Sequence, residues 1–208
     1  MFPEAVYIDT NSAINIAEQK SAGKLAEDYI NELIQRDGFI IWSHHTIDEL
    51  SGVLHVNHYK RIAKSKNIKG DHRYAAHKIA ENTATDQESI AAAQTVTGEL
   101  ERIVNYLEQF GMQVDAEETH VNELTNHIYT SYGNSKKDAK HIAIANINGV
   151  NNFLTQDGGF LRFPHINVFG SSQEISQTYN ASQLPAPFID LSKFLSSGKG
   201  NDSEGNVS

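Results

Sequence analysis

Short apolar runs alternate along the chain with longer stretches in which apolar residues recur at helical spacing. A run of about four apolar residues between turn signals is typical of a buried strand, and an apolar stripe at every third or fourth position is typical of a helix. We predict strands at 5–8, 39–42, 112–114, 152–155 and 166–169. We predict helices at 24–36, from Ser43 or Thr46 through Leu54, and at 86–110, 117–132 and 137–148. Because strands alternate with helices, the pattern predicts an α/β fold of three layers (α/β/α) with a central parallel sheet.

The chain between about 55 and 110 departs from this alternation. It is polar and rich in His, Lys and Arg as far as about 85, and a long amphipathic helix follows. We therefore predict a single domain over 1–195 that carries a helical insertion at about 55–110. From 196 to 208 the sequence consists mainly of Gly, Ser, Asp and Asn, a composition that predicts a disordered tail.

Composition narrows the functional classes. The 208 residues carry a formal net charge of -9, which does not suggest a protein that coats nucleic acid by bulk charge. The chain has no cysteine, so disulfides, thiolate metal sites and cysteine nucleophiles are excluded. It begins without the features of a signal peptide, and no apolar run approaches the roughly 18 residues that span a bilayer. We expect a cytoplasmic protein that does not enter a membrane.

Four acidic residues stand where predicted strands end or predicted helices begin, namely Asp9, Glu49, Asp138 and Asp157. The carboxyl ends of parallel strands and the amino ends of the neighbouring helices share one edge of such a sheet, where ligands bind. Carboxylates gathered there would repel one another without a cation. Mg²⁺ or Mn²⁺, which prefer oxygen ligands, are therefore the expected cofactors.

Each acid also has a purely structural interpretation. Asp9 and Asp138 can be helix N-caps, Glu49 can be a solvated helix residue, and Asp157 with Gly158 can form a turn. Their common relation to predicted strand ends favours a shared site over four separate structural roles.

The motifs around these acids are Tyr7-Ile-Asp9-Thr-Asn-Ser, Thr46-Ile-Asp-Glu49-Leu, Lys137-Asp138-Ala-Lys-His-Ile-Ala and Leu154-Thr-Gln-Asp157-Gly-Gly-Phe. They resemble the motifs of the PIN-domain family, which includes VapC-type toxins and other metal-dependent ribonucleases. The resemblance covers residues 5 to about 169 apart from the insertion. It implies that Asp9, Glu49, Asp138 and Asp157 hold the metal and catalyse, with Asn11, Ser12 and Thr155 as supporting polar residues. Some members carry a further acid two residues after the last Asp, where this chain has Gly159, so one strongly held metal is expected.

Two other kinds of site find less support in the sequence. Asp9 after a first strand is also typical of aspartyl phosphatases, but those need a second Asp where this chain has Asn11. His45 and Glu49 are four residues apart on a predicted helix and can face the same way, but a zinc site would need a third ligand and defined outer partners for its ligands. His141, three residues after Asp138, is interpreted either as an assisting residue or as a helix-packing residue.

A basic segment lies within 55–78, where seven of the seventeen Lys and Arg residues fall and Asp71 is the only acid. This segment can hold a phosphate backbone beside the acidic site, with Tyr59 and Tyr74 available to stack on bases. The alternative is a solvated helical face. The residues that we predict to bind nucleic acid are Lys60, Arg61, Lys64, Lys66, Lys69 and Arg73, with Lys78 nearby.

The leading hypothesis is a Mg²⁺- or Mn²⁺-dependent endoribonuclease that hydrolyses phosphodiester bonds of an RNA substrate. The resemblance raises the further hypothesis that the protein is the toxin of a toxin–antitoxin pair, with an antitoxin protein as partner. The alternative is a catalytically inactive PIN-like module that binds nucleic acid or protein. The sequence leaves open whether the chain forms a homodimer.

Overall fold

The fold is taken from a computed structural model that describes residues 3–18, 21–170, 172 and 175. The predicted disordered tail at 196–208 and the end of the predicted domain lie outside the described residues.

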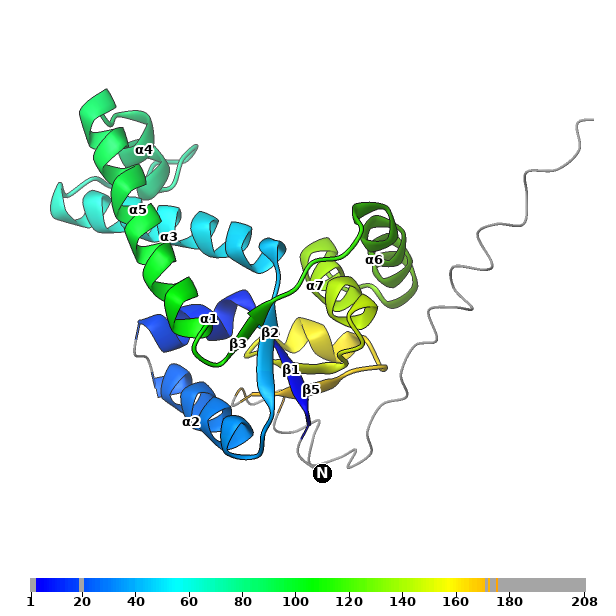
Figure 1. Ribbon diagram of the computed structural model, residues 1–208. Helices are drawn as coiled ribbons and strands as arrows, with labels where there is room; N and C mark the ends of the chain where they lie inside the picture. Colours follow the sequence, from blue (N-terminus) through cyan, green and yellow to red (C-terminus); the bar gives the residue numbers. More distant parts are fainter. Residues whose placement is uncertain (1–2, 19–20, 171, 173–174, 176–208) are drawn as a thin grey trace, which may run out of the picture.

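A parallel sheet of five strands forms the middle layer (Figure 1). Its spatial order is β3-β2-β1-β4-β5, so the first strand is central and the chain adds strands first on one side of it and then on the other. Every neighbouring pair is parallel. The strands are β1 (Ala5–Ile8), β2 (Phe39–Trp42), β3 (Gly111–Gln113), β4 (Asn152–Leu154) and β5 (Asn167–Phe169).

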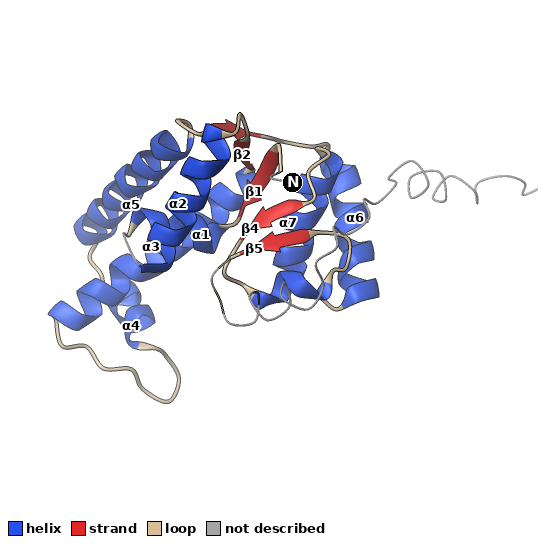
Figure 2. Ribbon diagram, turned by 90° about the horizontal axis from the view of Figure 1, so that it is seen from below, coloured by secondary structure: helices blue, strands red, loops and turns tan. Residues whose placement is uncertain are grey.

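Helices cover both faces of this sheet. Helices α1 and α2 lie on one side and α6 and α7 on the other (Figure 1), and the view from below shows the strands between the two groups (Figure 2). This arrangement confirms the three-layer α/β/α prediction. The helices are α1 (Thr10–Ala17), α2 (Ser21–Gln35), α3 (His44–Ser65), α4 (Ala76–Asn82), α5 (Asp86–Leu107), α6 (Glu118–Tyr132) and α7 (Lys136–Ile147), with a short 3-10 helix η1 (Gly158–Arg162).

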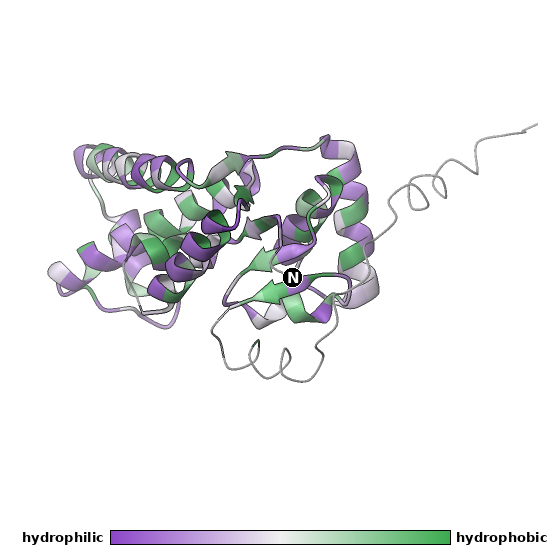
Figure 3. Ribbon diagram, turned by 60° about the horizontal axis from the view of Figure 1, so that its bottom comes forward, coloured by the Kyte–Doolittle hydropathy of each residue, from purple (hydrophilic) through white to green (hydrophobic). Residues whose placement is uncertain are grey.

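Two hydrophobic cores result from the alternation of side chains along the strands. Tyr7 and Phe153 point to the face covered by α6 and α7, whereas Val6, Ile8 and Leu154 point to the face covered by α1, α2, α3 and α5. Strands buried on both faces need apolar residues at consecutive positions, which is why these runs do not alternate with polar residues. The hydropathy colouring shows the apolar strands inside the molecule (Figure 3).

Helices α3, α4 and α5 extend beyond the sheet as an arm (Figure 1). A small third core of Tyr59, Ala63, Ala80 and Ala92 holds the three helices together. The expected start of the insertion at about 55 falls inside α3, which runs unbroken from His44 to Ser65. Helix α5 likewise returns to the sheet, because Ile103 and Leu107 belong to the core of the main body.

Most predicted elements agree with the structure to within a few residues, but the helix predicted through Leu54 continues to Ser65. Helix α7 begins one residue before the predicted start and is capped by Ser135, so Asp138 lies inside its first turn instead of opening it. In the amphipathic helix α5, the apolar residue Ile90 lies outside the buried face and is 60% exposed. Within the described residues, no helix has the length and apolar character needed to cross a bilayer.

Candidate functional site

Asp9 lies directly after β1, at the carboxyl edge of the sheet, and is buried. Its Oδ1 accepts a hydrogen bond from the Ser12 main-chain amide (2.8 Å), and its Oδ2 accepts one from the Thr155 hydroxyl (2.5 Å). Thr155 follows the adjacent strand β4, and its hydroxyl also accepts from the Asp157 amide at 2.9 Å. The Thr155 hydroxyl and the Ser12 main-chain amide therefore fix the orientation of Asp9, and the second of these bonds makes Asp9 the N-cap of helix α1.

Asp138 and Asp157 meet beside Gly159. A Cβ atom added at Gly159 would lie 2.7 Å from Asp138 Oδ2 and 3.1 Å from Asp157 Oδ1. The Gly159 amide donates to Asp157 Oδ1 at 2.8 Å, and the buried Asn134 side chain donates to the Gly159 carbonyl at 3.0 Å. The loop before α7 and the turn of η1 are thus tied together, and this contact sets one carboxylate against the other.

Glu49 projects from the second turn of α3, and donors occupy both of its oxygens. Oε1 accepts from Lys137 Nζ at 3.0 Å. Oε2 contacts His141 Nε2 at 2.9 Å and accepts from the Thr10 hydroxyl at 3.0 Å. Of the four predicted acids, Glu49 is therefore the one that forms an ion pair with a lysine, Lys137, in the described part of the chain.

A single cavity of about 320 Å³ joins these residues. All four predicted acids line it, although they come from positions far apart in the sequence, and Asn11 lines it too. Ser12 and Thr155 do not line the cavity, but they form hydrogen bonds to the carboxylate of Asp9, which does. The remaining lining residues are Thr10, Val53, Ser135, Lys137, His141 and Phe160.

The surroundings of this cavity raise the pKa of two of its carboxyls and lower the pKa of a third. Burial raises the pKa of Asp9, and the hydrogen bonds from Thr155 and Ser12 offset this only in part. Burial also raises the pKa of Asp138 against a hydrogen bond from Ser135, and the charges of Asp157 and Glu49 raise it further. For Glu49 burial acts in the same direction, but hydrogen bonds from His141, Lys137 and Thr10 prevail and hold its pKa well below the ordinary value. A cation among Asp9, Asp138 and Asp157 would relieve this repulsion.

His141 and His45 lie beside the acids. The His141 ring is buried between two partners, with Nδ1 2.9 Å from the Tyr7 hydroxyl and Nε2 on Glu49. His45, on the first turn of α3, packs on His141 with 4.5 Å between ring centroids. Burial and the neighbouring His141 lower the pKa of His45 to about 4. Over the described parts of the chain, only His45, Glu49 and His141 place three candidate ligand atoms within 4.8 Å of one another.

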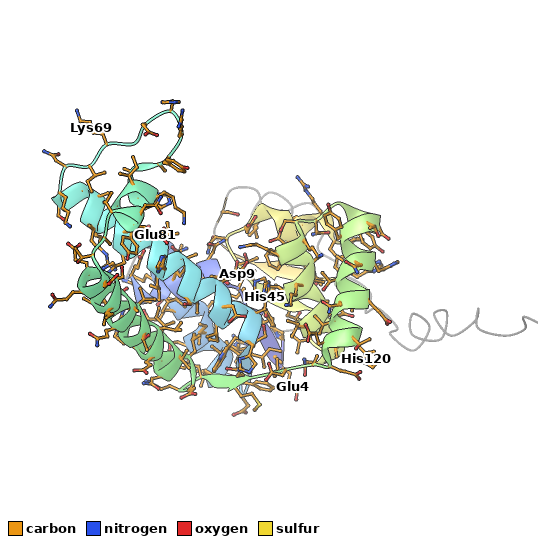
Figure 4. All side chains as sticks on the ribbon, turned by 90° about the horizontal axis from the view of Figure 1, so that it is seen from above. Glu4, Asp9, His45, Lys69, Glu81 and His120 are labelled. Carbon is orange, nitrogen blue, oxygen red and sulfur yellow. The ribbon has the colours of Figure 1, made fainter. Side chains whose placement is uncertain are left out.

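A second, more open groove of about 600 Å³ continues from this cavity along α3. The two share Glu49, Val53 and Lys137, and Lys60 lines the far part of the groove. Figure 4 shows Asp9 and His45 in the middle of the molecule and Lys69 at the outer end of the arm. The acidic cavity therefore opens onto one side of α3, and the basic segment begins along that side.

Acidic partners divide the predicted basic residues into two groups. Arg61 contacts both carboxylate oxygens of Glu99 (3.0 and 3.1 Å), and Lys66 contacts Glu88 (2.5 Å). These residues are exposed, so their ion pairs contribute little to stability but do reduce the positive charge offered to a ligand. Lys60, Lys64, Lys69 and Arg73 are exposed and form no ion pair with an acid in the described part of the chain.

The proposed stacking role of Tyr59 is wrong, because Tyr59 is 3% exposed in the small core of the arm. Tyr74 is 52% exposed and remains accessible.

The sequence motifs did not identify Tyr7, Thr10, Ser135 or Lys137 as parts of the site. Tyr7 looks like one more apolar strand residue, and its hydroxyl contacts with Ser43 (2.6 Å), Thr46 (3.0 Å) and His141 depend on the packing of α3 and α7. Lys137 stands next to Asp138 in the sequence, which was the available signal. A comparison with known protein families finds no match for this chain, and a comparison with curated proteins finds none.

Proposed function

We propose that the protein is a Mg²⁺- or Mn²⁺-dependent endoribonuclease of the PIN-domain kind. The observation that carries the proposal is the convergence of Asp9, Glu49, Asp138 and Asp157 on one cavity of about 320 Å³. Two features support it further. Burial raises the pKa of Asp9 and of Asp138, the latter also through the charges of Asp157 and Glu49, and a groove with lysines adjoins the cavity. Carboxyls with perturbed pKa values in a concave site are typical of functional centres.

The oxygen atoms of the donor set suit a hard divalent cation, which would have to draw the three aspartates closer together than they lie in the described structure. Asp9, Asp138 and Asp157 would hold the ion, and Asn11 adds an amide oxygen at the cavity wall. Glu49 would act from the side, because Lys137 and His141 already engage it. When bound, Mg²⁺ or Mn²⁺ supplies charge neutralisation and activation of water for attack on a phosphodiester.

The chain's own residues keep this arrangement fixed before substrate arrives. Thr155 and the Ser12 amide orient Asp9, and the Gly159 amide orients Asp157. Preorganised groups of this kind need no rearrangement during the reaction, which is why their positioning lowers the barrier. By the family resemblance, cleavage would leave a 5′-phosphate on one product.

The groove along α3 supplies a path for the RNA strand. Lys137 and Lys60 line it, and because Lys137 is paired with Glu49, the positive charge that a phosphate backbone would meet there comes mainly from Lys60. The exposed Lys64 is one helical turn beyond Lys60 and extends the same face. The groove would thus hold the strand while the acidic cavity receives one phosphodiester.

The variant Asp9→Asn tests this function. We expect RNA cleavage in Mg²⁺ or Mn²⁺ to fall by at least about a hundredfold, in the range seen when a central catalytic group is removed. Asp28→Asn, an equivalent change at an exposed position on α2, is the matched control and should cleave like the wild type. Equal cleavage by the wild type and Asp9→Asn would remove the proposed mechanism.

One observation favours the alternative of an inactive binding module. The carboxylate of Glu49 is occupied by Lys137, His141 and Thr10, so the protein itself already compensates the charge of one of the four acids. Titration with Mg²⁺ and Mn²⁺ distinguishes the two functions. Millimolar binding that Asp9→Asn abolishes supports the nuclease, and the absence of binding supports the module.

The biological role forms a further part of the proposal. The protein would act in the cytoplasm on RNA, and as a toxin it would be paired with an antitoxin encoded beside it. Inhibition of RNA cleavage by the product of an adjacent gene would support the toxin role, and an adjacent gene without that effect would favour a nuclease that acts alone.

A further inference from the structure

His45, Glu49 and His141 form a cluster that the proposed nuclease chemistry does not use as a unit. One ligand atom from each lies within 4.8 Å of the other two. His45 and Glu49 are one turn apart on α3, and His141 comes from α7 on the opposite side of the cavity. Two elements from distant parts of the chain therefore bring two imidazoles and one carboxylate together.

The His45 ring has an unfilled bonding position in this cluster. Its Nε2 atom is buried and has no hydrogen-bond partner among the described residues. A buried polar atom without a partner is uncommon in folded proteins and calls for an explanation. The ring packs on His141, 4.5 Å away between centroids, so the unpartnered nitrogen belongs to the cluster and not to a separate part of the surface.

His141 has the outer support that metal-binding histidines usually have. Its Nδ1 is 2.9 Å from the Tyr7 hydroxyl, and that hydroxyl is in turn held by Ser43 and Thr46. This contact fixes the ring and leaves Nε2 directed at Glu49. A partner on the outer nitrogen orients the ligating nitrogen and fixes the tautomer. His141 is thus the third ligand that a zinc site with His45 and Glu49 needs, and Tyr7 is the outer partner of His141.

We propose that His45, Glu49 and His141 bind a divalent transition metal of the zinc type, separately from the hard-cation site of Asp9, Asp138 and Asp157. Two imidazoles and one carboxylate suit Zn²⁺, whereas Mg²⁺ takes oxygen ligands. The bound ion would replace the contact between His141 Nε2 and Glu49 Oε2, which is 2.9 Å long, after a small outward shift of the two side chains. Because Glu49 and His141 line the cavity, the open fourth position of the ion faces it.

The two metal sites would influence each other through Glu49. Its Oε1 stays on Lys137 Nζ, 3.0 Å away, while Oε2 turns to the zinc-type ion. The ion would then stand at the wall of the acidic cavity and repel a second cation held by Asp9 and Asp138. Zinc would therefore weaken Mg²⁺ or Mn²⁺ binding, and the reverse would hold by linkage. Zinc binding itself does not depend on the proposed nuclease activity.

The test is a titration of the full chain, stripped of metal with EDTA and dialysed, with Zn²⁺ by calorimetry and with Co²⁺ by visible absorption. We expect the wild type to bind one equivalent, with the Co²⁺ spectrum of a nitrogen- and oxygen-ligated site. His45→Ala should weaken binding at least about tenfold, since removal of a ligand costs no less than removal of a partner of a ligand. His45 is on the edge of the cluster, so circular dichroism should show an unchanged fold.

His44→Ala is the matched control, because His44 precedes His45 on the same turn but its side chain is 71% exposed and contacts Asp115. It should bind Zn²⁺ like the wild type. Absence of Zn²⁺ binding in the wild type, or equal binding by the wild type and His45→Ala, overturns the proposal. The variant Asp157→Asn distinguishes a failure of the zinc proposal from a failure of the nuclease proposal. It should lose Mg²⁺- or Mn²⁺-dependent cleavage and retain Zn²⁺ binding.

Discussion

At the scale of single residues, the site consists of charges that the fold holds in unfavourable surroundings. Asp9 is buried, and the hydrogen bonds from Thr155 and Ser12 compensate the cost of its charge only in part. Glu49 is the opposite case, because Lys137 and His141 surround it. An ionised group with too little compensation lowers stability and is ready to take a cation, whereas a compensated one is already satisfied. Asp9, with Asp138, is therefore the expected point of hard-cation binding.

The first prediction follows from the raised pKa of Asp9. A carboxyl whose pKa is higher in the folded than in the unfolded state destabilises the fold once it is ionised, that is, as pH rises above its unfolded-state value of about 4. Asp9→Asn should therefore raise the melting temperature at pH 7 in EDTA, by roughly 2 °C or more. The gain should shrink as pH falls toward 4, because Asp9 takes up a proton in the folded state and the unfolded-state carboxyl approaches its own pKa.

Thermal unfolding of both proteins at pH 7, 5.5 and 4, each with EDTA and with Mn²⁺, checks this. Mn²⁺ should raise the melting temperature of the wild type and leave Asp9→Asn unchanged. A lower melting temperature for Asp9→Asn in EDTA would mean that hydrogen bonding outweighs the cost of the buried charge.

The second prediction concerns Gly159. An added Cβ would meet Asp138 Oδ2 at 2.7 Å and Asp157 Oδ1 at 3.1 Å, so both carboxylates would have to move. Gly159→Ala should weaken Mn²⁺ binding about tenfold, the lower end of what displaced metal ligands cost. The same contacts explain why this position cannot carry the extra acid found in some PIN domains without rearranging the other two.

Gly98→Ala is the control for this prediction, because Gly98 is an exposed helical residue with no atom within 4 Å of the added Cβ. It should leave Mn²⁺ binding unchanged and stabilise the fold by about 0.5–1 kcal/mol. Unchanged Mn²⁺ affinity in Gly159→Ala would exclude the pair of Asp138 and Asp157 as metal ligands.

The acids of the site could be predicted from the sequence, but their partners could not. An Asp after a buried strand stands out because charge is costly there, and its position relative to the sheet edge follows from strand direction alone. Tyr7 and Lys137 owe their roles to side chains that approach from other elements, and no local pattern encodes those approaches. For Tyr59 the sequence suggested a ligand-binding role that the structure does not support, because its aromatic ring packs in the core of the arm.

At the scale of elements, α3 connects the two halves of the proposed function. Its first two turns carry His45 and Glu49 into the site, and its later turns carry Lys60 and Lys64 along the groove. Since the helix is continuous from His44 to Ser65, the distance between acidic cavity and basic segment is fixed by helix geometry. A strand of RNA bound along α3 would thus meet both in a constant register.

The third prediction tests this role of α3. Replacing Lys60 and Lys64 together by Gln should weaken binding of single-stranded RNA and reduce the slope of log K against log salt by about 0.7 for each phosphate that the variant no longer neutralises. Lys24→Gln, on the exposed face of α2, removes a charge away from the groove and should leave the slope unchanged. Binding measured by fluorescence anisotropy at several salt concentrations decides this, and an unaltered slope in the double variant would exclude the groove as the RNA path.

Element boundaries were predicted well where local chemistry marks them and less well elsewhere. Strands β1 and β2 match the predicted ranges because apolar runs end abruptly at Asp9 and Ser43. In α2 the buried apolar residues are Ala26, Ile30 and Leu33, whereas Leu25 is 55% exposed. Leu25 and Ala26 are adjacent apolar residues, so the sequence alone does not show which of them faces the core. The start of the insertion was misplaced because a change in composition inside α3 does not interrupt the helix.

At the scale of the whole molecule, the strand order places the site. The chain adds β2 and β3 on one side of β1, and then β4 and β5 on the other side. The order in which strands are added therefore reverses between the neighbouring strands β1 and β4. Asp9 and Asp157 follow these two strands, and the Asp9 amide donates to the Leu154 carbonyl at 3.2 Å. Ligand sites of open parallel sheets lie at such a point. The alternation of strands and helices predicted the three layers. The packing of the arm depends on contacts of Tyr59 and Ala92, which the spacing of apolar residues in the sequence does not predict.

The most direct test of the central claim is cleavage by the purified full chain of a labelled single-stranded RNA and a DNA of the same sequence, in Mg²⁺, in Mn²⁺ and in EDTA. We predict internal cleavage of the RNA with either ion, 5′-phosphorylated products and no cleavage in EDTA, together with loss of cleavage in Asp9→Asn. Intact RNA in both ions, or cleavage that persists in EDTA and in Asp9→Asn, would contradict a metal-dependent nuclease built on these four acids.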